Sequence, residues 1–216
     1  MKKYLFMQRA LAVISQGHLF TSIVASTLRV FAVLLSLGAL VAWLKMWKLV
    51  FNMNGAAILG GTLFQAFFVI GVYMVIHTWW IRAEDIRALR GSEFTVIPIL
   101  SVLLKMLGET YACVSLTLGV GGGVAALFGG HLGNRIAWFL PGLGLPQFLL
   151  VGLLGGGENS FISAVLLAVG GAIAAVFWLF LFYCASEILV ALVAVARNTA
   201  ALLRIAERQT QSGENS

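Results

Sequence analysis

The sequence predicts an all-α integral membrane protein with about four transmembrane helices. Hydrophobic residues make up 61% of the 216 residues and charged residues only 10%, and the mean hydropathy is +0.99. A soluble domain holds roughly 45–50% apolar and about 25% charged residues. The apolar residues also fall in runs of about 20 or more, the length that crosses the hydrocarbon core of a bilayer. Lipid is therefore the expected solvent for most of the chain.

The N-terminal segment, residues 1–20, is mixed in polarity. Its apolar residues, such as Leu11 and Ile14, fit one face of a short helix on the cytoplasmic membrane surface. The first span is predicted at about 21–44. Arg29 comes early enough in this run for its side chain to reach the near interface.

The second span is predicted at about 55–80. Gly60 and Gly61 each follow an alanine by four positions, a spacing that lets another helix approach closely. Three arginines follow the span: Arg82, Arg87 and Arg90. This end should therefore face the cytoplasm.

The next apolar block is too long for one simple span, and it has two interpretations. In the favoured one, residues 94–107 form a separate helix in the membrane plane, and the third span covers 109–130. This keeps Lys105 and Glu109 near the interface. In the other, Pro98 lies in the first turn of one long helix, where proline is tolerated.

Small residues mark a predicted packing face in the third span. Ser115, Gly119 and Gly123 recur at four-residue spacing and so lie on one side of a helix. The glycine run is not a phosphate-binding loop, because no Lys-Ser/Thr pair follows it and no strand precedes it. We therefore expect a contact between helices here and no nucleotide.

Residues 131–160 connect the third span to the last one. They contain two prolines and many glycines but almost no charge, which argues against a plain water-exposed loop. Each of their apolar pieces is too short to span. Segment 136–154 is expected to lie at the outer interface, to re-enter the membrane, or to contact a partner subunit.

The last span is predicted at about 161–190. The helix should continue into the cytoplasm as part of the tail 197–216, with a disordered polar end after Gln209. Small residues again recur at four-residue spacing: Ala164, Ala168 and Ala172 on one stripe, and Gly171 and Ala175 on another. These stripes predict close helix packing.

Basic residues set the expected topology. They cluster before the first span, after the second and after the fourth, whereas only Lys45, Lys48 and Arg135 fall on the other side. This bias puts both termini in the cytoplasm, with a helical membrane domain over 21–196. Because the sequence has no Asn-x-Ser/Thr site, we expect a multi-pass protein of a bacterial inner membrane.

Five polar residues within or beside the spans are candidates for function, since a charge at the bilayer centre costs roughly 2.5–3.5 kcal/mol. They are Arg29, His77, Lys105, Glu109 and Glu187. All are expected near the cytoplasmic ends, where they would form a proton- or cation-handling site, or a metal site with His77, Glu109 and Glu187 as ligands. The favoured interpretation is plainer: the side chains reach the interface separately or pair locally, as Lys105 with Glu109.

Other sites and partners are not indicated. No nucleophile–base set, metal-ligand motif or cofactor motif is present, and the dispersed basic residues argue against nucleic acid. Cys113 and Cys184 lie in apolar runs and predict no disulfide.

The expected function is that of a structural or accessory subunit of a larger membrane complex. Its partners would be the lipid bilayer and other membrane subunits or further copies of itself. The alternative is a small oligomeric transporter or channel. A membrane-embedded enzyme acting on lipid or quinone is the second alternative.

Overall fold

The computed structural model describes residues 18–53, 55–89, 96–128 and 160–214, and this part of the chain is helical without strands. Four of its helical stretches are long and apolar enough to cross a membrane, which confirms the predicted class. The elements are α2 (His18–Phe51), α3 (Ala56–Ala88), α4 (Val96–Leu116), a π-helical turn η1 (Thr117–Gly121), α5 (Gly122–Leu127) and α8 (Ser160–Glu214).

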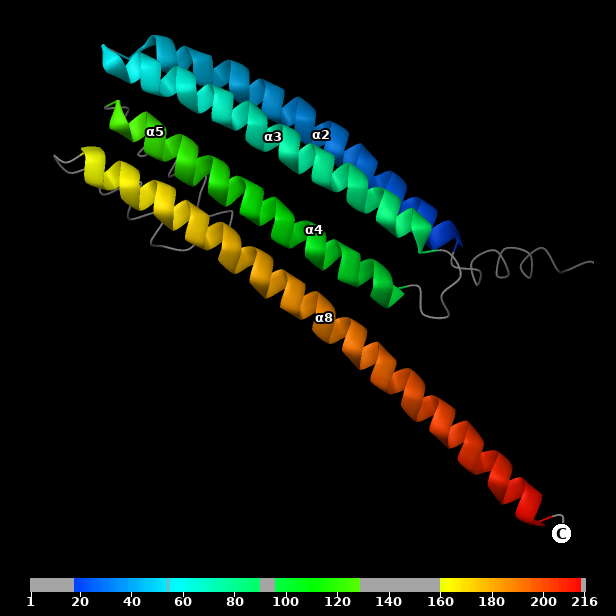
Figure 1. The fold of residues 1–216 in the computed structure, drawn as a ribbon. Helices are drawn as coiled ribbons and strands as arrows, with labels where there is room; N and C mark the ends of the chain where they lie inside the picture. Colours follow the sequence, from blue (N-terminus) through cyan, green and yellow to red (C-terminus); the bar gives the residue numbers. More distant parts are fainter. Residues whose placement is uncertain (1–17, 54, 90–95, 129–159, 215–216) are drawn as a thin grey trace, which may run out of the picture.

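The helices form an open row (Figure 1). α2 packs along α3, α3 packs along α4, η1 and α5, and these pack along α8. Among the described helices, α2 does not pack against α8, so the row does not close into a four-helix bundle. We call this arrangement the helix layer. No other described helix covers either face of this layer.

A tight hairpin joins α2 to α3. The amides of Asn52 and Met53 donate to the carbonyls of Leu49 and Val50 at 3.2 and 3.0 Å. Gly55 then begins α3 with a φ of +59°, a conformation that favours glycine. This turn fixes α2 and α3 as antiparallel neighbours.

Residues 96–127 form one continuous helical stretch through α4, η1 and α5. The favoured prediction of a separate helix over 94–107 is therefore wrong. The alternative fits, because Pro98 lies in the first turn of α4, where the missing N–H is not needed. The π turn begins at Thr117, whose hydroxyl donates to the carbonyl of Cys113 at 2.7 Å.

Contact between α4–α5 and α8 depends on glycine. A methyl group on Gly119 would lie 2.5 Å from the Cα of Gly171, and one on Gly123 would lie 2.7 Å from the carbonyl oxygen of Ala164. We call Ser115, Gly119, Gly123, Ala164 and Gly171 the glycine seam. The predicted packing face is thus a contact within the chain, at backbone-to-backbone distance.

The structure differs from the prediction at Ala172. Ala164 is buried and Ala168 half-buried, but Ala172 is exposed. Four residues rotate by about 400°, so a strict four-residue stripe drifts around the helix. The buried face of α8 instead alternates steps of three and four through Leu167 and Gly171.

Small residues also flank both sides of α3. A methyl group on Gly60 would lie 2.8 Å from the carbonyl oxygen of Ala125, and one on Gly61 would lie 2.8 Å from Val50. The predicted small-residue spacing therefore serves two neighbours, with Gly60 facing α5 and Gly61 facing α2.

Several predictions concern segments beyond the described residues. The amphipathic segment 1–20 lies outside them up to position 17, and the connection 131–160 lies outside them up to position 159. At the other end of the chain, α8 continues past Arg197 as predicted, but it reaches Glu214. The prediction of a disordered end after Gln209 is therefore wrong for the residues up to Glu214.

The glycine seam predicts a large difference between two similar substitutions. Gly119→Ala should lower the free energy of unfolding by about 1–3 kcal/mol, because the new methyl group meets the backbone of Gly171. Unfolding in mixed micelles, followed by tryptophan fluorescence, measures this. Gly38→Ala is the matched control, since a methyl group there meets nothing within 4 Å. If the two substitutions changed the free energy of unfolding equally, the claim that the glycine seam requires glycine would be wrong.

Candidate functional site

The guanidinium of Arg82 is the centre of a polar cluster between α3, α4 and α8. Its Nε donates to Oε2 of Glu109 at 2.9 Å, and its Nη2 donates to Oε1 of the same carboxylate. Its Nη1 donates to Asp85 at 2.7 Å, three residues on in α3. The planar fork of arginine suits this two-point contact with a carboxylate, which fixes direction as well as distance.

Tyr183 brings α8 into the same cluster. Its hydroxyl donates to Oε1 of Glu109 at 2.6 Å and accepts from Nη2 of Arg82 at 3.2 Å. The side chains of Arg82 and Glu109 are only 21% and 19% exposed. Since charges removed from water need nearly complete hydrogen bonding, the tyrosine supplies a contact that the pair alone would lack.

A second ion pair links α4 to α8 beside this cluster. Lys105 Nζ lies 3.3 Å from Oε1 of Glu187 and 5.4 Å from the ring centre of Tyr183. The Glu187 side chain is 69% exposed. An ion pair this open contributes at most about 1 kcal/mol. It is therefore a weaker contact than the Arg82–Glu109 pair.

A third ion pair links α2 to α3. Arg29 Nη2 lies 3.4 Å from Oε1 of Glu84, and the guanidinium carbon lies 4.9 Å from the ring centre of Trp80. Contacts therefore run across the helix layer from α2 to α8. We call the set the charged belt: Arg29, Arg82, Glu84, Asp85, Lys105, Glu109, Tyr183 and Glu187.

Apolar clusters lie on both sides of the charged belt. Toward the N-terminus of α2 lies a buried core from α2, α3 and α4: Ala25, Leu28, Ala83, Ile86, Ile99 and Met106. In the opposite direction, Tyr111 stacks on Trp178 and Phe182 with ring centres 4.9 and 5.8 Å apart. The belt residues are thus interleaved with buried apolar side chains.

Two further hydrogen bonds strengthen the helix contacts beside the belt. The hydroxyls of Ser101 in α4 and Ser186 in α8 lie 2.6 Å apart and are buried. Trp79 Nε1 donates to the hydroxyl of Thr110 at 2.9 Å, which joins α3 to α4. Every neighbouring pair of helices in the layer therefore has a polar link at this level.

The structure brings four of the five predicted polar residues into the belt. His77 lies apart from them and stacks on Tyr73, with ring centres 5.8 Å apart. It does not join Glu109 and Glu187, and in the described part of the chain no three His, Cys, Asp or Glu side chains are grouped to hold a metal ion. The predicted local pair of Lys105 with Glu109 is also wrong, because each side chain pairs with a different helix.

Sequence reasoning missed half of the belt. In the sequence, Arg82 indicates only the cytoplasmic side, and Glu84, Asp85 and Tyr183 are not among the candidate residues. The three-residue spacing of Arg82 and Asp85 in the sequence indicates an ion pair within one helix. No spacing in the sequence indicates the contact of Arg82 with Glu109, because these residues lie on different helices.

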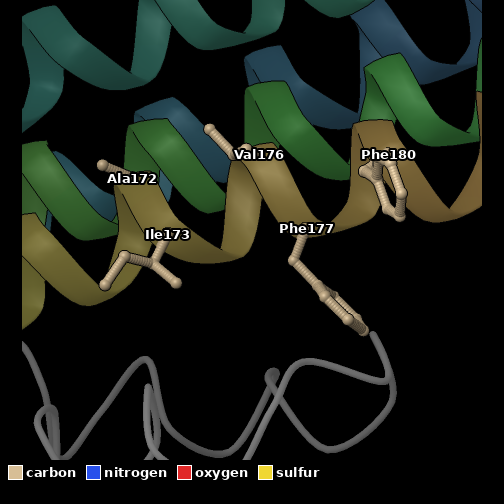
Figure 2. Close-up of a pocket in the computed structure, with 5 residues that line it drawn as sticks. All are labelled: Ala172, Ile173, Val176, Phe177 and Phe180. Carbon is tan, nitrogen blue, oxygen red and sulfur yellow. The ribbon is translucent and has the colours of Figure 1, made fainter.

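The belt can clamp helices together, because each carboxylate in it lies against a cation. A separate open depression lies on the outer side of α8, and Figure 2 shows Ile173 and Phe177 pointing away from the helices behind them. Its lining is apolar and stands apart from the belt.

No protein-family model, curated protein or solved structure matches this chain.

The belt predicts unequal contributions from its ion pairs. Glu109→Gln should lower the free energy of unfolding by about 2 kcal/mol, because Arg82 loses its two-point anionic partner. Glu84→Gln is the control and should cost under about 1 kcal/mol, because the Glu84 side chain is 63% exposed. A double-mutant cycle on each pair measures the coupling. A coupling for Arg82–Glu109 no larger than that for Arg29–Glu84 would refute the assignment.

Proposed function

We propose that this protein is a structural or accessory subunit of a larger membrane assembly, in a bacterial inner membrane and with both termini in the cytoplasm. The observation that supports this is the open helix layer. A closed bundle hides the inner side of each helix, whereas here only 17% of the most apolar window of α2 is buried, against 39% for α4–α5. A layer of this kind suits side-by-side packing with other membrane helices.

The charged belt supports the assignment of membrane depth. Each helix continues from the belt to its far end for roughly the length that crosses the hydrocarbon core, about 20 residues. The stretches run from Arg29 to Phe51 in α2, from Ala56 to Arg82 in α3, from Glu109 to Leu127 in α4–α5 and from Ser160 to Tyr183 in α8. Arg82 and Arg87 lie on the belt side, so the belt would mark the cytoplasmic interface.

The pairing within the belt favours a structural role over transport. A carboxylate that carries protons or cations needs its charge open to the passing ion. Glu109 instead accepts from both Arg82 and Tyr183, and Glu187 lies against Lys105. The small oligomeric transporter or channel therefore stays the alternative function, to be separated by experiment.

Purification from the native membrane tests the proposed function. We expect the tagged chain, extracted in a mild detergent, to bring other proteins with it in stoichiometric amounts, identified by mass spectrometry. A bulky change on the exposed surface of α2, Gly38→Trp, should reduce this yield if α2 faces a partner, while leaving the helix layer folded.

The contrary result is equally specific. A chain that purifies alone and conducts ions in liposomes, with flux lost in Glu109→Gln or Glu187→Gln, would make the protein a transporter. Unchanged flux in both variants would remove the belt from any transport pathway.

A further inference from the structure

α8 extends well beyond the other helices. Near the N-terminal end of α4, Ser101 is hydrogen-bonded to Ser186 of α8 and Lys105 is paired with Glu187. From Ile188 the helix continues to Glu214, roughly 40 Å further at 1.5 Å per residue, and Figure 1 shows it leaving the layer as one continuous helix. An isolated helix of this kind depends on packing for most of its stability.

This extension carries a stripe of exposed apolar side chains. Ile188, Leu192, Val195 and Leu202 are 60–67% exposed. With Thr199 they follow steps of four and three residues, the spacing that coiled coils use for their core positions. We call these five residues the α8 stripe.

Two arginines of the extension lie on the opposite side of the helix. At about 100° per residue, Arg197 and Arg204 fall within about 20° of the direction of Ser186, which faces α4. The α8 stripe falls at about 160–240° from that direction. The positions that flank the stripe are uncharged as well: Leu189, Ala191, Ala196, Asn198, Leu203 and Ile205.

We propose that the α8 stripe packs against the α8 stripe of a second copy of this chain, with the two helices parallel. Copies that share one membrane orientation bring their α8 helices together in the same direction. In a parallel contact each side chain meets its own counterpart, so a charge there would repel itself. The stripe and its flanks carry no charge, which permits self-association.

A different partner fits this surface less well. Coiled-coil pairs between unlike chains are usually specified by complementary charges at the flanking positions. Those positions hold alanine, leucine, isoleucine and asparagine here. Apolar residues at core and flanking positions together form the pattern of a helix that packs against other helices in a bundle.

The same side of α8 remains exposed nearer the layer. Ile173 and Phe177 are 59% and 51% exposed and point away from the other helices in Figure 2. Helical rotation places them within about 60° of Ile188. A second copy would therefore contact α8 along the depression as well as along the extension.

This inference rests on the proposed function, because it names one neighbour in the proposed assembly. Its test is cysteine cross-linking of the full chain in liposomes, with Cys113 and Cys184 replaced by alanine. Thr199→Cys lies on the stripe, and the matched variant Ala201→Cys lies about 160° away on the same turn. Reaction with a maleimide confirms that both thiols are accessible, and an unchanged circular dichroism spectrum confirms that both variants are folded.

We expect Thr199→Cys to form a disulfide-linked dimer at least about five-fold faster than Ala201→Cys, because a disulfide needs Cα atoms within about 7 Å. Equal rates, or no dimer from Thr199→Cys, would overturn the proposal. So would quenching of a fluorophore at position 199 by brominated lipid, which would place the stripe on the bilayer. A cross-linked dimer without co-purifying proteins would support this inference and refute the proposed function. Co-purifying proteins without a cross-linked dimer would support the proposed function and refute this inference.

Discussion

The two-point contact between Arg82 and Glu109 is the interaction on which the rest of the structure depends. It joins α3 to α4, and through the hydroxyl of Tyr183 it also fixes α8. An arginine so largely withdrawn from water is stable only when its donors are satisfied, so the three helices can meet in few relative positions. The weaker pairs of the charged belt extend this alignment outward to α2 and along α8.

Away from the belt, a different constraint holds the helices together. Lipid tails are as apolar as leucine, so apolar burial gives little reason for two helices to associate in a bilayer. Close backbone contact takes its place, and the approach of Gly119 to Gly171 is its clearest example. The belt thus fixes direction and register through charges, while the glycine seam supplies contact area. Neither feature would hold α4 to α8 as well without the other.

The sequence alone predicts the helical class, the four apolar stretches and the seam residues Gly119 and Gly171, because these follow from composition and from spacing along one helix. It does not predict the pairing of Arg82 with Glu109 or of Lys105 with Glu187, because partners on different helices depend on rotation and tilt. Ala172 shows the same limit, since a small drift per turn moves it from the contact face to the exposed one. The break expected before Glu109 failed for a related reason: charges near an interface mark depth and do not end a helix.

An open layer has a consequence that a closed bundle lacks. Because α2 and α8 lie at its two edges without packing on each other, each keeps a long apolar side that no other described helix covers. Lipid satisfies such a side within the bilayer, and this accounts for α2. Lipid within the bilayer does not explain the exposed apolar side chains of α8 beyond the charged belt. There Leu192 and Leu202 are exposed, and no other described helix runs alongside. At the membrane depth proposed above, this part of α8 lies outside the lipid that covers α2, and its uncharged stripe fits the proposed contact with a second copy.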